Sequence, residues 1–282
     1  MISINCGGKQ LSLRTPQIMG VLNITPDSFS DGGQFIDGSG RVDIDRALRA
    51  ADTMVEQGAA IIDVGGESTR PGAKPVSGQQ QMDRISQVVD QLAGQIDAVI
   101  SVDTSSPVLM LEVAKLGAGM INDIRALTAP GALEAAASTG LAVCMMHMQG
   151  QPASMQEAPV YRDIVEEVIG FFRQRTEAFS DVGIDSANIL IDPGFGFGKT
   201  LDHNLELLTG LDRFSVLGFP VLVGMSRKAM IGQMTNRNVA ERVHGSVASA
   251  MIAVQRGANI VRVHDVGATQ DMINVHLAVT GE

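Results

Sequence analysis

Short runs of apolar residues alternate with longer amphipathic stretches along most of this chain. The amphipathic stretches repeat apolar residues at helical spacing, for example over 42–55, 82–92, 108–116, 164–179 and 239–254. The apolar runs occupy residues 18–22, 60–64, 98–102, 119–121, 142–145, 189–191, 221–223 and 260–263. Strands that alternate with helices favour parallel pairing through right-handed crossovers. Eight such units predict an α/β fold, a (β/α)₈ TIM barrel, with a doubly wound sheet as the alternative.

The start of the chain has a different pattern. Residues 2–4 and 11–13 alternate apolar and polar side chains around Gly7-Gly8, which predicts a β-hairpin ahead of the barrel. No Ser-rich or Pro-rich linker divides the residues that follow. We therefore expect a single domain over residues 1–282.

One hexapeptide pattern occurs three times: Gly, Ala, any residue, two apolar residues and one polar residue. It spans residues 58–63, 117–122 and 257–262 and ends on Asp63, Asn122 and Arg262. Glycine suits the left-handed turn just past a helix end, and the apolar pair predicts a buried strand. Because the polar residue falls where the strand ends, the pattern predicts a site on one face of a parallel sheet.

Polar side chains follow every predicted barrel strand, and the carboxyl ends of parallel strands meet at one face. They are Asn23, Asp63, Asp103, Asn122, His147, Asp192, Ser226, Lys228, Arg262 and His264. A single strand-end Asp is usually a helix cap or a salt-bridge partner. Polar groups at successive strand ends favour a functional site instead.

Two pairs of these residues have the spacing of one strand face. Side chains two apart on a strand point the same way. Arg262 and His264 have this spacing, and so do Ser226 and Lys228. Arginine beside histidine predicts an anion site, because the guanidinium group supplies a planar fork of donors. Arg227 should point away from Lys228 and is a weaker candidate.

Asp103, Asn122 and Asp192 form a complementary group of hydrogen-bond acceptors. They suit a neutral heterocycle whose edge is rich in N–H donors, and they equally suit a metal ion. The residues alone leave these alternatives open. His147 is expected to be a buried histidine with satisfied hydrogen bonds rather than a catalytic base.

The segment 194–200, Gly-Phe-Gly-Phe-Gly-Lys-Thr, is close to a phosphate-binding loop. It fails that pattern by one position, because the first glycine of the pattern falls on Pro193. We interpret it as a tight loop that brings Phe197 over the pocket. The alternative is a loop whose phenylalanines only pack.

Composition limits the partners. The chain has 282 residues, 45% of them hydrophobic and 18% charged, with a net charge of −10. This acidity argues against nucleic acid or an anionic membrane as a partner, because both attract clustered positive charge. No apolar run is long enough to cross a bilayer. Two cysteines and no basic, apolar leader predict a cytoplasmic location.

Taken in order, the motifs resemble those of the dihydropteroate synthase family over nearly the whole chain. The matching segments are 22–33, 65–72, 101–104, 122–124, 145–150, 192–199, 224–228 and 262–266. The resemblance implies a (β/α)₈ barrel that joins 4-aminobenzoate to (7,8-dihydropterin-6-yl)methyl diphosphate. The implied products are 7,8-dihydropteroate and pyrophosphate. It also implies a Mg²⁺ cofactor and a homodimer.

The resemblance also implies a role for individual positions. Pterin would be held by Asp103, Asn122, Asp192 and Lys228, with Met146 and Phe197 lining the pocket. Diphosphate would be held by Arg262 and His264, with magnesium on Asn23. Thr69, Arg70 and Ser226 would lie near the aminobenzoate. The expected catalytic residues are Arg262, His264, Lys228, and, in the first mobile loop, Phe29 and Asp31.

Three other functions remain possible from the residues. A lyase or aldolase could use Lys228 as a Schiff-base amine. A methyltransferase acting between a folate and a corrinoid protein would share the pterin pocket but release no pyrophosphate. A pterin carrier would bind the ring without catalysis.

Overall fold

Eight parallel strands form a closed sheet at the centre of the structure. The structure is a computed structural model, and it describes residues 3–25, 35–36, 41–67, 78–152 and 154–281. The strands are β3 (Gln17–Asn23), β4 (Ala59–Gly65), β5 (Val99–Asp103), β6 (Met120–Asp123), β7 (Ala142–Met146), β8 (Ile189–Asp192), β9 (Leu222–Val223) and β10 (Ile260–Val263). Their order is β8-β7-β6-β5-β4-β3-β10-β9. A parallel bridge between Ile191 and Val221 joins the two ends of this order. The barrel prediction is therefore confirmed, because a doubly wound sheet stays open.

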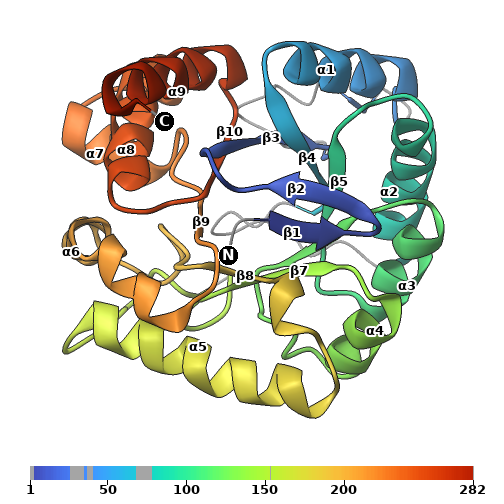
Figure 1. Cartoon of the computed structure of the whole chain (residues 1–282), viewed down its shortest axis with the longest axis horizontal. Helices are drawn as coiled ribbons and strands as arrows, with labels where there is room; N and C mark the ends of the chain where they lie inside the picture. Colours follow the sequence, from blue (N-terminus) through green and yellow to red (C-terminus); the bar gives the residue numbers. More distant parts are fainter. Residues whose placement is uncertain (1–2, 26–34, 37–40, 68–77, 153, 282) are drawn as a thin grey trace.

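Helices surround the strands as a ring (Figure 1). They are α1 (Ile44–Glu56), α2 (Gly78–Ala93), α3 (Pro107–Lys115), α4 (Ala132–Thr139), α5 (Ile164–Asp181), α6 (Leu201–Thr209), α7 (Ala229–Thr235), α8 (Val243–Gln255) and α9 (Val266–Thr280). Short 3₁₀ helices are η1 (Ser186–Asn188), η2 (Leu211–Leu217) and η3 (Val239–Glu241). The predicted helix over 239–254 is in fact η3 followed by α8, with Arg242 between them.

Several helices begin at side chains that the sequence supplies for this purpose. Asp43 caps α1, Ser106 caps α3 ahead of Pro107, and Asp163 caps α5, each by accepting from a backbone N–H of the first turn. Thr200 begins α6 with a reciprocal capping pair that includes His203. These caps end the strand-to-helix loops at defined residues.

The N-terminal hairpin pairs β1 (Ser3–Cys6) with β2 (Lys9–Ser12) in antiparallel register, as predicted. It lies across one end of the barrel (Figure 1). Its turn contacts the residues that precede β6, since a Cβ on Gly7 would lie 3.1 Å from the Ala118 carbonyl oxygen. The hairpin therefore closes the N-terminal end and leaves the carboxyl ends of the strands on the opposite face.

The hairpin packs on apolar side chains from every strand of the barrel interior. This cluster joins Ile4, Cys6, Leu11 and Leu13 to Met19, Ile61, Val99, Met120, Ala142, Cys144, Leu190, Leu222 and Ile260. Residues two further along each strand face the same way. The inward-facing polar residues of the strands are thus stacked directly above an apolar floor.

The three glycines of the hexapeptide pattern adopt the expected conformation. Gly58, Gly117 and Gly257 have φ values of +107°, +97° and +93°, which lie where glycine is strongly preferred. Each stands between a helix and the next strand. Within the described part of the chain, no helix is both long and apolar enough to cross a membrane.

Candidate active site

The three polar residues of the hexapeptide pattern meet inside the barrel. Asp63 is fully buried and accepts hydrogen bonds from Arg262 Nε at 2.7 Å and Asn122 Nδ2 at 3.2 Å. Ser101 Oγ donates to its other oxygen at 2.6 Å. These side chains come from β4, β10, β6 and β5, which lie apart in sequence. A buried carboxylate is thereby paired and hydrogen-bonded, the condition under which an interior charge is tolerated.

Arg262 lies between two carboxylates. Its Nη2 is 3.6 Å from Asp103 Oδ2, in addition to the bond that Nε makes to Asp63. Burial, followed by the charge of Asp63, raises the pKa of Asp103 to about 7, although Arg262 opposes the shift. The mouth of the barrel therefore holds a cation in a fixed orientation and a carboxyl group that titrates near neutral pH.

Asp192 and Lys228 form a second charged group at the same end of the barrel. Asp192 Oδ1 accepts from the Gly194 backbone N–H at 2.8 Å. Lys228 Nζ donates to the Phe195 carbonyl oxygen at 2.7 Å and lies 4.5 Å from the centre of the Phe197 ring. Burial raises the pKa of Asp192, opposed first by Lys228, and lowers the pKa of Lys228 to about 8, opposed by Asp192.

An apolar wall adjoins this group. Phe197, Met146 and Met155 are buried against one another, with Ile124 and Met148 partly buried beside them. Met146 is the register partner of Asp192 in the β7–β8 pair. The charged edge and the apolar wall together suit a flat ring with polar edges.

Ser226 and His264 contact each other where β9 and β10 end. Ser226 Oγ accepts from the His264 backbone N–H at 3.2 Å and lies 3.0 Å from its ring Nδ1. This contact joins the loop that follows β9 to the end of β10. Strand β9 ends at Val223 and Arg227 adopts a left-handed turn, so the prediction that Ser226 and Lys228 share one strand face is wrong.

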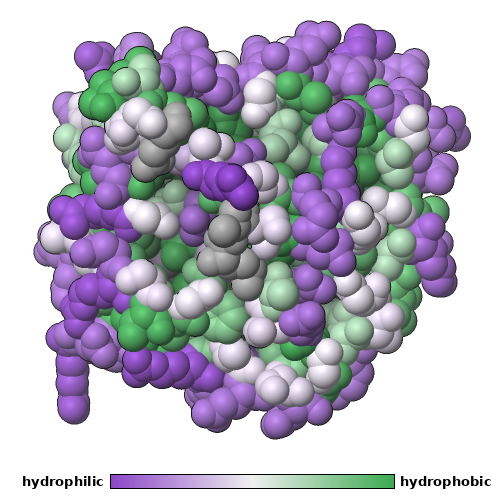
Figure 2. All heavy atoms as spheres, in the orientation of Figure 1, coloured by the Kyte–Doolittle hydropathy of each residue, from purple (hydrophilic) through white to green (hydrophobic). Residues whose placement is uncertain are grey.

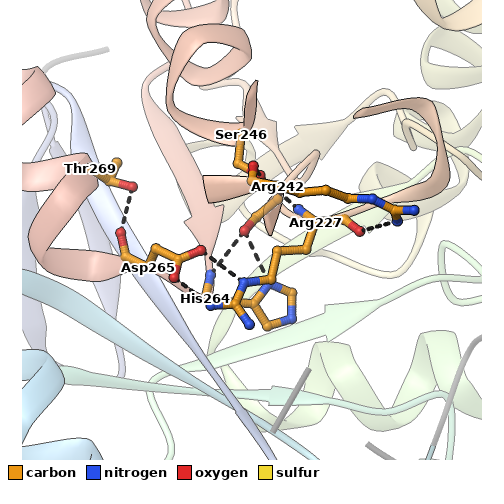
Figure 3. A network of polar contacts seen from close by, with 7 residues as sticks. Arg227, Arg242, Ser246, His264, Asp265 and Thr269 are labelled. Atoms are coloured by element: carbon orange, nitrogen blue, oxygen red, sulfur yellow. Dashed lines mark hydrogen bonds and ion pairs between the residues drawn. The ribbon is translucent and has the colours of Figure 1, made fainter. Parts of the chain in front are cut away.

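Arg227 connects the loop that follows β9 to the residue that follows β10. Its guanidinium donates to both carboxylate oxygens of Asp265, at 2.9 and 2.5 Å (Figure 3). Its backbone N–H donates to Ser246 Oγ at 2.9 Å, and Arg242 Nη1 donates to its carbonyl oxygen at 3.0 Å. Arg227 has a φ of +57°, which is uncommon for a residue with a side chain. The surrounding bonds hold this conformation.

His147 and Lys199 lie behind the apolar wall. His147 is buried, and its Nδ1 is 3.0 Å from Lys199 Nζ. Burial, followed by the charge of Lys199, lowers the pKa of His147 to about 2. The prediction of a buried histidine with satisfied hydrogen bonds is confirmed, because His147 stays neutral and has a partner.

Asn23 ends β3 beside the glycine that ends β4. The two residues pair in register, and a Cβ on Gly65 would lie 3.3 Å from Asn23 Oδ1. The missing side chain at Gly65 therefore leaves space for the amide of Asn23. A Cβ there would also lie 4.0 Å from Asp103 Oδ2, which places Asn23 on the Arg262 side of the mouth.

The structure thus gathers most of the predicted site residues at one end of the barrel. They are Asn23, Asp103, Asn122, Met146, Asp192, Phe197, Ser226, Lys228, Arg262 and His264. Phe29, Asp31, Thr69 and Arg70 lie outside the described residues.

Sequence reasoning placed Asp63 among the polar strand ends without a specific contact, gave no site role to Lys199 or Asp265, and ranked Arg227 low. Asp63 carried a usable signal, because it closes the same hexapeptide pattern as Asn122 and Arg262. The contacts of Lys199 and Asp265 depend on loops that only the fold brings together.

Comparisons with known proteins agree with this geometry. The sequence model of the family described as "Pterin binding enzyme" matches residues 19–264. The dihydropteroate synthase of Haemophilus influenzae is 50% identical over 274 residues, covering 97% of this chain and 98% of that protein.

Solved structures give the same result. The Yersinia pestis dihydropteroate synthase, crystallised with a sulfonamide drug, matches with a TM-score of 0.95 and 49% identity, covering 99% of this chain and 100% of that one. The Xanthomonas albilineans enzyme in complex with 7,8-dihydropteroate matches with a TM-score of 0.88 and 41% identity, covering 99% of both chains. With this identity over nearly its whole length, the chain belongs to the dihydropteroate synthases, within the family of pterin-binding enzymes.

Proposed function

We propose that the mouth of the barrel is where this chain joins 4-aminobenzoate to (7,8-dihydropterin-6-yl)methyl diphosphate, the transferase reaction of its family. The observation that carries the proposal is the shared position of two groups. A Cβ on Gly224 would lie 3.7 Å from Arg262 Cβ and 3.8 Å from Lys228 Nζ, so the group of Asp192 and Lys228 adjoins the group of Arg262, Asp63 and Asp103 at one end of the barrel. One group suits a nitrogen heterocycle and the other suits a departing anion.

The pterin ring is assigned to the first group. An ionised carboxylate can accept two adjacent N–H donors, and charge-assisted bonds are about twice as strong as neutral ones. Asp192 supplies that carboxylate, with Asn122 and Asp103 as further polar contacts. Met146 and Phe197 provide the buried apolar wall beside it. Burial raises the pKa of Asp192, and nearby Lys228 opposes this by favouring the ionised form that the ring requires.

The diphosphate is assigned to Arg262 and His264. As the bond between the methylene carbon and the bridging oxygen breaks, negative charge accumulates on the departing diphosphate. Arg262 uses Nε on Asp63 and has further N–H groups for the anion. Because Asp63 and Asp103 hold the guanidinium in place, it needs no reorganisation when the charge develops.

The nucleophile needs no dedicated base. The nitrogen of an aryl amine attacks the methylene carbon as a neutral group, the carbon–oxygen bond breaks, and diphosphate leaves with the bonding electrons. The extra proton on nitrogen is then lost to solvent or to the diphosphate. This agrees with His147, which is buried against Lys199 and whose pKa is lowered to about 2 by burial and by the charge of Lys199. We assign Ser226, with Thr69 and Arg70, to the aminobenzoate side, and Phe29 and Asp31 to the loop that excludes water.

The amide oxygen of Asn23 is a suitable ligand for magnesium. Mg²⁺ is usually held by one or two protein oxygens together with substrate phosphates and water. Asn23 offers one amide oxygen over the space left by Gly65, and the described residues contain no cluster of three or more acidic, His or Cys side chains that could hold a metal. When bound, the ion would neutralise charge on the diphosphate. It would thus be held jointly by the protein and the substrate.

A homodimer is proposed from the outer faces of α8 and α9. An amphipathic surface helix has a polar outer face, but α8 exposes Ile252, and α9 exposes Val275 and Val279. Hydrophobic side chains gather at the surface over the corner where α7, α8 and α9 lie (Figure 2). A second copy of the chain would cover these residues. Both cysteines are free, in keeping with the proposed cytoplasmic location.

Pyrophosphate release tests the proposed function. The chain is mixed with both substrates, and pyrophosphate and 7,8-dihydropteroate are measured together. Equal amounts of both products are expected, and neither should form when 4-aminobenzoate is omitted. Binding of pterin without either product would instead indicate a carrier. A substrate trapped on Lys228 by borohydride would indicate Schiff-base chemistry.

A further inference from the structure

Lys199 is a buried lysine for which the reaction has no use. Its side chain lies at the end of the loop between β8 and α6, and the residue is 3% exposed. A lysine is seldom buried to this extent unless its ammonium group is fully paired. Its contacts therefore show what the ammonium group does there.

The ammonium group of Lys199 joins two loops. Nζ donates to the carbonyl oxygens of Gly194 at 2.9 Å and Phe197 at 3.0 Å, both in its own loop. It also lies 3.0 Å from His147 Nδ1, in the loop that follows β7. Neutral His147 can accept there, so all three N–H groups of the lysine have partners.

The loop that Lys199 holds leaves no space for adjustment. Gly194 and Gly198 have φ values of +74° and +60°. A Cβ on Gly194 would lie 1.9 Å from the His147 carbonyl oxygen, and one on Gly198 would lie 2.3 Å from that of Gln149. The backbones of the two loops are therefore in direct contact, and Lys199 bonds across that contact.

The outer side of this loop carries the pterin site. Gly194 N–H bonds to Asp192 Oδ1, and the Phe195 carbonyl oxygen accepts from Lys228. Phe197 places its ring against Met146 and near the ammonium group of Lys228. A shift of the loop would thus move an acceptor, a cation and the apolar wall at once. Arg262 and its partner Asp63 lie on β10 and β4, away from this loop, and would stay in place.

We propose that Lys199, with His147 as its acceptor, is a positioning residue that sets the geometry of the pterin wall and so controls the affinity of this enzyme for the pterin ring. The proposal rests on the proposed function of the site. It predicts a selective effect on the pterin ring, whereas a residue that only stabilises the fold would weaken pterin and 4-aminobenzoate binding alike.

The test uses the full chain with Lys199→Met, which keeps the apolar stem and removes the ammonium group. The probe is 6-hydroxymethylpterin, which carries the ring without the diphosphate. Its Kd is measured by calorimetry below pH 7, where Lys199 keeps its proton in the folded protein. We expect a Kd about tenfold higher than in the native protein, and a KM for 4-aminobenzoate within about twofold. The control is Lys115→Met, because Lys115 is exposed on α3 and pairs only with Glu112 among the described residues.

Two further variants keep the proposal testable if Lys199→Met does not fold. His147→Asn keeps an oxygen acceptor near the position of Nδ1, and should bind the probe within about twofold of the native protein. His147→Leu removes the acceptor and should weaken binding about tenfold. Unchanged affinity in Lys199→Met or His147→Leu would overturn the proposal, as would equal losses for pterin and 4-aminobenzoate. If the native protein itself fails to bind the probe, the proposed function is wrong instead.

Discussion

Asp63 is a fully buried carboxylate, and its bonds explain why Arg262 is held still. Arg262, Asn122 and Ser101 all donate to it. Removing one member of a buried ion pair usually costs more than the pair contributes, because the remaining charge is left uncompensated. The residues of this cluster therefore affect both stability and chemistry, and variants must be chosen to separate these effects.

Replacing Arg262 should affect turnover more than ring binding. Arg262→Ala removes a preorganised donor from the departing diphosphate, and we expect kcat to fall by about 10²- to 10³-fold. Steady-state kinetics and calorimetry with 6-hydroxymethylpterin measure the two effects separately. Arg262→Lys is the control, since it keeps a charge near Asp63 but loses the planar fork. Normal turnover in Arg262→Ala would exclude the leaving-group role.

Asp192→Asn should instead weaken binding of the pterin ring more than it lowers turnover. The amide keeps one acceptor but replaces the other with a donor, which faces the N–H groups of the pterin edge. Loss of a charged hydrogen bond costs about 1.5–3 kcal/mol, so the Kd for 6-hydroxymethylpterin should rise about ten- to a hundredfold. Calorimetry checks this, with circular dichroism to verify folding. An unchanged Kd would rule out Asp192 as the main pterin acceptor.

At the scale of elements, the loops after β8, β9 and β10 carry much of the site and contact one another. Arg227 and Asp265 join the loops after β9 and β10, and Lys199 joins the loop after β8 to that after β7. Ion pairs and buried hydrogen bonds of this kind fix loops that would otherwise be among the more mobile segments. These contacts therefore tie the loops around the proposed substrate site to one another.

The burial of Lys199 has a consequence for stability. Its pKa is lowered from 10.5 to about 7, mainly by burial, with Asp192 opposing and Lys228 adding to the shift. Between these pH values the unfolded chain binds the proton and the folded chain does not. The contribution of this lysine to the free energy of unfolding therefore rises as the pH increases from about 7 to 10.5.

Urea unfolding across this pH range can isolate that contribution. The difference in unfolding free energy between the native protein and Lys199→Met should grow steadily from pH 7 upward. Lys228, whose pKa is lowered to about 8, titrates in both proteins and largely cancels in the difference. A difference that stays constant over this pH range would show that Lys199 keeps its proton in the folded protein.

At the scale of the whole molecule, closure of the barrel decides which predicted residues meet. Strand–helix alternation and polar strand ends were sufficient to predict the fold and the end of the barrel where the site lies. They could not predict that Asp63 on β4 holds Arg262 on β10, because that contact crosses the interior. Nor could spacing predict the left-handed turn at Arg227, which bonds from Ser246, Arg242 and Asp265 sustain.

The outer face of α9 provides the last prediction, which concerns assembly. Val275 and Val279 are 58% and 81% exposed and lie one helical turn apart, so both project from the same face. In a two-fold symmetric dimer each substitution occurs twice in the interface. Burying a charge at such a position without a partner is costly. Val275→Glu combined with Val279→Glu should therefore shift the proposed dimer to monomers.

Sedimentation velocity at micromolar concentration measures this shift. The control is Val108→Glu, because Val108 is 64% exposed on α3, far along the ring from α9 (Figure 1). That variant should remain dimeric. A native chain that sediments as a monomer would refute the homodimer. A double variant that stays dimeric would place the interface on another face, and would leave the exposed valines of α9 without the partner that their chemistry predicts.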